Sequence, residues 1–469
     1  MNLINKQTIG LSLGVLALIV PVCLPLEGLN LAGQITLGVF LMASIFWILE
    51  PIPIFATSML VILLQVCLLS EQGLLSQRLS NGEIAYTPQS YKDFYNTLAS
   101  PIIILFLGGF SLATAAVKYG IDRNLTRLLL KPFGSHPPNV CLGLMVSTAI
   151  LSAFMSNTAT TAMMVTVILP IIAQLDSSDP FKKAIALSIP IGANIGGIAT
   201  PIGTPPNAIA LAALREQGFE ITFSTWMLLA VPLVALMLFL SWRLLLLLFP
   251  PTTQSFNIHI ESKFTRSPAT IGAYIIFAAT VLLWVTEKIH GISSTVIAFL
   301  PIAILPALKI LDKQDIRSFS WEVLWLVAGG ISLGLSLEQT GLADWIIHLV
   351  NWETLGGLGL LLLFSLVGFG VANLISNTVS ATILVPIAIG LGVSGAAGDA
   401  FDMQPSILTI AIVVSFSMAL PISTPPNAIA MSTGMIETKD MAKAGIIIGI
   451  LGIAGTLISS LFFWPMILR

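Results

Sequence analysis

The sequence predicts an all-α polytopic membrane protein made of two inverted repeats, with about eleven transmembrane helices and two re-entrant hairpins. Composition is the first reason, because 56% of the 469 residues are hydrophobic and only 9% are charged, whereas soluble domains carry about 25% charged residues. Apolar runs of about 20 residues are the second reason, since each can cross the ~30 Å of hydrocarbon in a bilayer. Two pairs of repeated motifs are the third.

The apolar runs follow one another from end to end of the chain. They lie at 8–26, 32–49, 52–69, 98–117, 137–173, 183–214, 224–249, 268–286, 291–311, 320–337, 355–392, 405–434 and 444–466. The first run follows Lys6 and is not followed by an Ala-x-Ala cleavage site, so we expect a retained helix rather than a signal peptide.

Two runs, 137–173 and 355–392, are too long for a single crossing. Each has a Ser-Asn-Thr triplet near its middle, formed by Ser156, Asn157 and Thr158 in the first run and by Ser376, Asn377 and Thr378 in the second. If each run turns at its triplet, the two arms suit a re-entrant hairpin that enters and leaves on the same side of the membrane.

The distribution of positive charge supports this topology. With a cytoplasmic N-terminus, eleven crossings and two hairpins, 15 of the 20 Lys and Arg residues fall inside. The outside residues are Arg78, Lys92, Arg215, Lys288 and Arg469. This excess inside is what the positive-inside rule expects, and it places the C-terminus outside the cell membrane. The first hairpin then opens from the cytoplasm and the second from outside.

The two halves share motifs in register. Thr-Pro-Pro-Asn-Ala-Ile-Ala occupies 204–210 and again 424–430, and the triplets are separated by the same offset of 220 residues. The expected organisation is therefore a first repeat over 1–249 (scaffold helices 1–130, hairpin 137–173, broken helix 183–214), a linker over 250–266, and a second repeat over 267–469 (hairpin 355–392, broken helix 405–434).

The repeated motifs also predict a binding site. Each Pro-Pro pair should break its helix within the membrane, and broken helices at equivalent places of two inverted halves point to a central transport site. The triplets offer neutral oxygens together with N–H and O–H donors. Sodium would take the oxygens, whereas a carboxylate would take the donors and the positive ends of the half-helices. Because no Lys or Arg lies in these motifs, a carried anion would need co-bound cations.

Other classes of function lack support in the sequence. The net charge of −2 without a basic run gives a nucleic-acid partner no electrostatic basis. The three cysteines and four histidines have no metal-ligand spacing, and no set of nucleophile, base and orienting group suggests an enzyme or a bound cofactor. Glu50 and Glu287, each shortly after a Trp at a helix end, are weaker candidates for a proton relay, and a structural role is the preferred interpretation.

Paired Ser-Asn-Thr triplets, each followed by a Pro-Pro-Asn break, resemble the divalent anion/sodium symporter family over essentially the whole chain. The resemblance implies a homodimer in the lipid bilayer whose transport domain moves against a fixed scaffold in an elevator motion. It also implies sites at residues that match the family's motifs. The implied substrate contacts are Ser156, Asn157, Thr158, Ser376, Asn377, Thr378, Thr424 and Pro425, with Thr204 and Pro205 on the pseudo-symmetric side.

Two sodium sites are implied by the same resemblance. The first would use Ser152, Ser156, Asn157 and the backbone at Gly203. The second would use Ala372, Ile375, Asn377 and Ser423. Ala372 stands where a hydroxyl residue is usual, so only its carbonyl could serve there.

The function that we expect is sodium-coupled secondary transport of small divalent anions, with four-carbon dicarboxylates such as succinate, malate or fumarate ahead of citrate and sulfate. Some relatives exchange substrates without sodium, so a sodium-independent dicarboxylate exchanger is an alternative. A cation/proton antiporter of related architecture is another, and a non-transporting membrane scaffold or receptor is the most distant.

Overall fold

The structure is a computed structural model that describes residues 3–76, 86–176, 178–253, 255, 266–343, 345, 355–393 and 401–468. Within these residues the regular structure is helical, apart from one isolated bridge between Ser70 and Gln89. Eight described helices are long and apolar enough to cross a membrane. The protein is thus an all-helical, multi-pass membrane protein.

The helices follow the apolar runs in order. The longer ones are α1 (Leu3–Cys23), α2 (Leu31–Leu49), α3 (Ile54–Leu69), α6 (Pro101–Lys118), α7 (Ile121–Leu130), α8 (Pro137–Phe154), α9 (Asn157–Ile172), α10 (Phe181–Gly197), α11 (Pro205–Glu216), α12 (Phe223–Leu248), α13 (Pro268–Val285), α18 (Trp321–Gln339), α20 (Gly356–Leu374), α21 (Asn377–Val393), α22 (Met403–Ser415), α23 (Pro425–Ser432) and α24 (Thr438–Ile458). The shorter ones are α5 (Tyr91–Asn96), α14 (Glu287–His290), α15 (Ser294–Ile297), α16 (Phe299–Ala307) and α17 (Lys313–Arg317).

Both long apolar runs turn at their triplets. Helix α8 ends at Phe154 and α9 begins at Asn157, while α20 ends at Leu374 and α21 begins at Asn377. The two arms of each pair pack against each other. Each run therefore forms a helical hairpin, and the second arm of each hairpin starts at the Asn of its triplet.

The two Pro-Pro motifs each begin a new helix. Proline suits the first turn of a helix because the missing N–H would have no partner there. Pro205 opens α11 and Pro425 opens α23, and the preceding threonines have almost the same extended backbone, with φ −147° and ψ 144° at Thr204 and φ −143° and ψ 146° at Thr424. The chain between Gly197 and Pro205, and between Ser415 and Pro425, is thus non-helical at two matching places.

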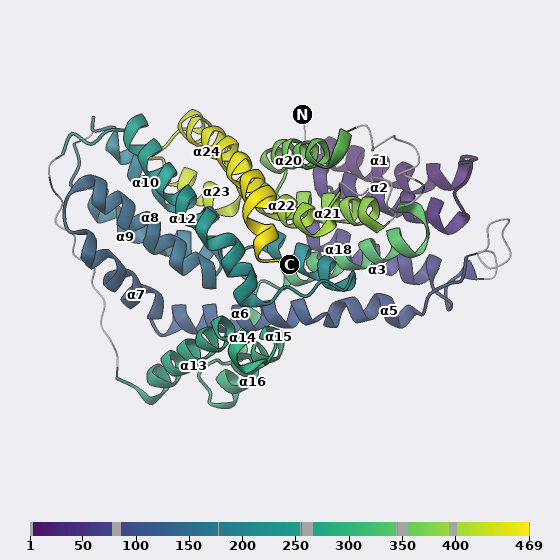
Figure 1. The fold of residues 1–469 in the computed structure, drawn as a ribbon, viewed down its shortest axis with the longest axis horizontal. Helices are drawn as coiled ribbons and strands as arrows, with labels where there is room; N and C mark the ends of the chain where they lie inside the picture. The colour runs from purple at the N-terminus through teal and green to yellow at the C-terminus, as the bar shows by residue number, and fades with distance from the viewer. Residues whose placement is uncertain are drawn as a thin grey trace.

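The hairpins and broken helices pack reciprocally. Helix α9 packs on α23 and α21 packs on α11, while α10 also contacts α23 and α22 contacts α11. In Figure 1, α1 and α2 lie at one end of the molecule and α7 to α9 at the other, with α6 and α18 between them. A separate hydrophobic core holds α2 and α3 against α18, including the fully buried Trp47 and Leu333. This arrangement leaves α6 and α18 beside the hairpins.

Several helices differ by a few residues from their expected bounds: α1 begins at Leu3 rather than 8 and α24 at Thr438 rather than 444. The run 291–311 contains α15 and α16 and ends at Ala307, because Lys309 takes a positive φ of 54° and the amide of Ile310 donates back to the carbonyl of Leu305. Most of the expected linker 250–266 lies outside the described residues.

Candidate functional site

A cavity of about 300 Å³ lies where the two hairpin turns meet the two helix breaks. Its lining contains every residue for which a substrate contact was implied: Ser156, Asn157, Thr158, Thr204, Pro205, Ser376, Asn377, Thr378, Thr424 and Pro425. Four helices, α9, α11, α21 and α23, begin at these residues. Four helix N-termini therefore converge on one cavity with their positive dipole ends; α9 and α21 also bring backbone N–H groups, whereas α11 and α23 begin with two prolines, which have none.

The residues of the first implied sodium site form a tight oxygen cluster. Ser152 Oγ lies 2.5 Å from Asn157 Oδ1 and 2.9 Å from the carbonyl oxygen of Ala193, and Ser152 is fully buried. Only one hydroxyl proton is shared among these three oxygens, so lone pairs remain available. A cluster of neutral oxygens of this kind can coordinate a hard cation.

Gly197 explains how Asn157 and Gly203 come so close together. A Cβ on Gly197 would lie 2.8 Å from the Asn157 side chain and 3.1 Å from the Gly203 carbonyl oxygen. A Cβ on Gly203 would in turn lie 2.4 Å from the Gly197 carbonyl oxygen. Both glycines are needed for this close approach of backbone and side chain.

The second implied sodium site differs in chemistry. Asn377 Oδ1 is buried and has no hydrogen-bond partner within the described residues. Ser423 Oγ donates to the Asn373 carbonyl at 3.0 Å and accepts from the amide of Leu420 at 3.2 Å, and Ala372 is fully buried. A buried amide oxygen without a donor is costly unless a cation or another donor meets it, so this oxygen also fits a cation ligand.

Both breaks are held closed by the Asn that ends the Pro-Pro motif. Asn207 Nδ2 donates to the carbonyls of Gly197 and Thr200 at 3.0 and 2.8 Å. Asn427 Nδ2 donates in the same way across the other break, at 2.9 and 3.0 Å. The sequence motif marks these residues, but their bracing of the helix ends follows only from the structure.

The cavity also has lining residues outside the repeated motifs. They are Phe106, Gly109 and Phe110 of α6, Phe154 and Met155 at the first hairpin turn, Asn194 of α10, Ile202 and Gly203 in the first helix break, Ser320, Glu322 and Val323 around the start of α18, and Ser423 in the second break. Asn194 could have been suspected as a polar residue inside an apolar run.

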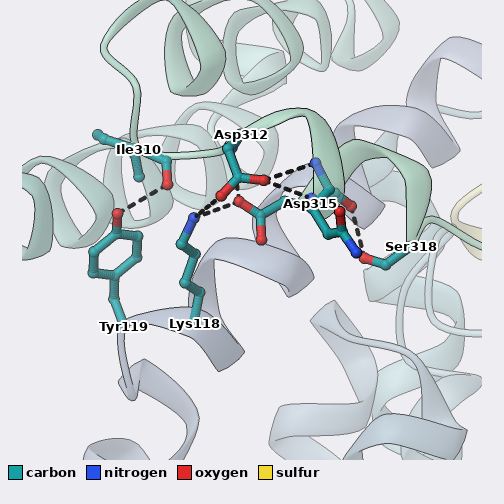
Figure 2. Close-up of polar contacts among 7 residues, drawn as sticks. Lys118, Tyr119, Ile310, Asp312, Asp315 and Ser318 are labelled. Carbon is teal, nitrogen blue, oxygen red and sulfur yellow. Dashed lines mark hydrogen bonds and ion pairs between the residues drawn. The ribbon is translucent and has the colours of Figure 1, made fainter.

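A wider cavity of about 770 Å³ adjoins the central one, and both include Ser156, Thr158, Glu322 and Pro425 in their linings. This vestibule extends to Lys118 at the end of α6. Its wall is fixed by the contacts drawn in Figure 2, in which Lys118 Nζ lies 3.0 Å from Asp312 Oδ2 and 2.5 Å from Asp315 Oδ2. Tyr119 Oη donates to the Ile310 carbonyl at 2.8 Å, so α6 is tied to the chain between α16 and α18.

Glu287 lies away from the central cavity. Its carboxylate accepts hydrogen bonds from the amides of Phe223 and Ser294, at 2.8 and 2.9 Å. These bonds cap the first turns of α12 and α15, and they account for a buried carboxylate without a proton relay. Glu50 is exposed and ends α2 with a left-handed backbone, φ 49°.

Comparison with known proteins places the chain in a family. The model of the sodium:sulfate symporter transmembrane region matches residues 5–469. The chain is 28% identical to the sodium-dependent dicarboxylate transporter SdcS of Staphylococcus saprophyticus, over 98% of this chain and 92% of that protein. It is 30% identical to an uncharacterized transporter of Haemophilus influenzae, over 90% of each chain.

A solved structure with a similar fold is the YdaH transporter of Alcanivorax borkumensis. The TM-score is 0.51 with 13% sequence identity, over 87% of this chain and 98% of that one, so the likeness concerns the fold alone. Together with the motifs at the cavity, the match over nearly the whole length shows that the chain belongs to the divalent anion/sodium symporter family of membrane transporters.

Proposed function

We propose that the protein couples sodium to the movement of small divalent anions, with C4-dicarboxylates such as succinate, malate and fumarate as its substrates. The observation that carries this proposal is the convergence of four helix N-termini on one small cavity. The dipoles of all four termini, and the first backbone N–H groups of α9 and α21, would stabilise an anionic oxygen. The similarity to the sodium-dependent dicarboxylate transporters of Staphylococcus agrees with this substrate class.

Sodium coupling is supported by the charges around the cavity. Its described lining contains no Lys or Arg, and its one carboxylate belongs to Glu322. Four helix ends at about half an elementary charge each would offset about two negative charges, so a dianion together with Glu322 still leaves negative charge to be balanced from elsewhere. The oxygen clusters at Ser152 and Asn157, and at Asn377, are suited to hold the cations that supply it.

An elevator motion, a homodimer and a cytoplasmic N-terminus complete the proposal. Residues of the hairpins and broken helices line the cavity together with residues of α6 and of the start of α18. Movement of the first group past the second would carry the site across the membrane. With the charge-based orientation, the vestibule at Lys118 opens on the cytoplasmic side, so this would be an inward-facing state.

Uptake by proteoliposomes separates the candidate functions. Purified protein is reconstituted, and radiolabelled succinate is supplied with either sodium or potassium outside. Accumulation driven by the sodium gradient supports the proposal. Succinate movement that needs internal dicarboxylate but no sodium would instead indicate a dicarboxylate exchanger. Sodium-dependent proton flux without succinate movement would indicate a cation/proton antiporter.

The two triplet asparagines should be essential for uptake. Asn157→Ala and Asn377→Ala each remove an amide oxygen and two donors from a hairpin turn at the cavity, and we expect each to abolish sodium-driven uptake while the protein stays folded. Asn124→Ala is the matched control, since Asn124 lies on α7 and bonds the hydroxyl of Tyr274 away from the cavity. Near wild-type uptake by both triplet variants would place the site elsewhere.

A further inference from the structure

One buried side chain, Asn194 of α10, joins the two halves of the site. Only 3% of its surface is exposed, and it lines the central cavity. Its Nδ2 lies 3.1 Å from Thr424 Oγ1 and 3.1 Å from Asn427 Oδ1, although these residues are more than 200 positions away. A residue of the first repeat therefore contacts the Pro-Pro motif of the second.

The orientation of the two amides follows from the surrounding bonds. Asn427 Nδ2 donates to the carbonyls of Met418 and Leu420 at 2.9 and 3.0 Å, so its nitrogen must face those acceptors. Its Oδ1 then faces Asn194, which must present N–H groups in return. Asn194 uses one N–H on Asn427 and the other on Thr424.

This arrangement determines what the Thr424 hydroxyl can do. Thr424 Oγ1 accepts from Asn194 Nδ2 at 3.1 Å and from the amide of Asn427 at 3.4 Å. A hydroxyl oxygen has two lone pairs and one proton, so both acceptor positions are occupied. The proton of Thr424 is left to donate, and Thr424 lines the cavity.

The matching place in the other half lacks this arrangement. The position equivalent to Asn194 at the offset of 220 is Val414 on α22, which packs against α11. Thr204 has no side-chain capping bond, and Asn207 Oδ1 is buried without a hydrogen-bond partner in the described part of the chain. The two halves thus differ in the donor state of their threonines.

We propose that Asn194 is a positioning residue that fixes the Thr424 hydroxyl as a donor to one carboxylate of the substrate. The inference rests on the proposed dicarboxylate transport and deepens it. The Thr424 side of the cavity recognises an anionic oxygen, whereas the Thr204 side has no such fixed donor. Asn194 acts through Thr424 and therefore sets affinity for the anion rather than for sodium.

Kinetics of uptake test the role of Asn194. Asn194→Asp keeps the shape of the side chain but replaces Nδ2 by oxygen, which can draw the Thr424 proton away from the cavity. Asn194→Leu removes the donors altogether. We expect both variants to raise the KM for succinate by about tenfold or more, which is the scale of one hydrogen bond to a charged group, and to leave the sodium concentration for half-maximal uptake unchanged.

Two further variants separate positioning from general damage. Ser188→Ala on the same helix removes a buried hydroxyl that donates to the Ile185 carbonyl, and it should leave both constants unchanged. In a Thr424→Val background the hydroxyl is absent, so Asn194→Leu should then change the KM by less than about twofold.

The possible results lead to distinct conclusions. An unchanged succinate KM in folded Asn194→Asp protein would overturn the inference while leaving dicarboxylate transport in place. So would an equally large effect of Asn194→Leu with and without the Thr424 hydroxyl. Absence of succinate uptake by the unmodified protein would overturn the proposed function and this inference with it.

Discussion

Replacing Ser152 by alanine should raise the sodium concentration needed for half-maximal uptake. The Ser152 hydroxyl lies 2.5 Å from Asn157 Oδ1 and 2.9 Å from the Ala193 carbonyl, at the centre of the first oxygen cluster. The substitution removes one oxygen ligand without changing charge. A loss of about 1 kcal/mol, typical of one hydrogen-bond-sized contribution, corresponds to a roughly fivefold shift.

The assay is the sodium dependence of radiolabelled succinate uptake by proteoliposomes at fixed membrane potential. Ser147→Ala is a matched control, because Ser147 lies on the same helix α8, is fully buried, and its Oγ has no hydrogen-bond partner in the described residues. We expect the control to behave like the wild type. An Ser152→Ala variant with unchanged sodium dependence would refute the assignment of this cluster to sodium.

Three further predictions concern the second cation site, the proposed motion and stability. Ala372→Ser should lower the sodium concentration for half-maximal uptake by adding an oxygen, and an unchanged value would argue against a cation there. In protein without its native cysteines, the double variant Gly109→Cys, Ile202→Cys should form a disulfide, because the two Cβ atoms would lie 3.5 Å apart. The disulfide should stop uptake until a reductant is added. Full uptake by the disulfide-bonded protein would contradict an elevator motion. Asp179→Asn should lower the thermal midpoint at neutral pH, since Asp179 Oδ2 accepts hydrogen bonds from Thr252 and Thr253, with oxygen separations of 2.6 and 2.9 Å to their hydroxyls.

The effect of Asp179 should depend on pH in a defined direction. Burial alone would raise the pKa of this carboxyl, but the hydrogen bonds from Thr252, Phe181 and Thr253 outweigh it and hold the pKa below its ordinary value. A carboxyl with a depressed pKa stabilises the fold above its unfolded pKa of about 4, and this stability is lost as the pH falls through the folded pKa. The difference in midpoint between wild type and Asp179→Asn should therefore shrink below about pH 4. A constant difference would show that ionisation is not involved.

The hairpin turns and helix breaks could be expected from the sequence because their causes are local. A Pro-Pro pair favours a helix that begins at its first proline, here Pro205 or Pro425, whatever surrounds the pair. The triplets interrupt runs that are too long for one crossing, and the helices do end and begin there. The motifs also predict that the ten implied substrate residues meet at one site, and all ten line one cavity. This meeting depends on the reciprocal packing of the two halves.

Other features depend on contacts that no motif records. Asn194 has no polar counterpart at Val414, so comparison of the two halves draws no attention to it. The need for Gly197 arises from the approach of Asn157 and Gly203, which come from different helices and loops. The early end of α16 follows from the positive φ at Lys309, a backbone conformation that its sequence neighbours do not signal.

The most direct test of sodium-driven dicarboxylate transport at this cavity is whether sodium entry depends on succinate. Entry of radioactive sodium into proteoliposomes is measured with and without external succinate, for the wild type and for Asn157→Ala. We predict that succinate stimulates sodium entry through the wild-type protein and that the variant, which lacks the amide 2.5 Å from Ser152 Oγ, shows no stimulation. Sodium entry that is independent of succinate, or succinate uptake without sodium entry, would contradict the account.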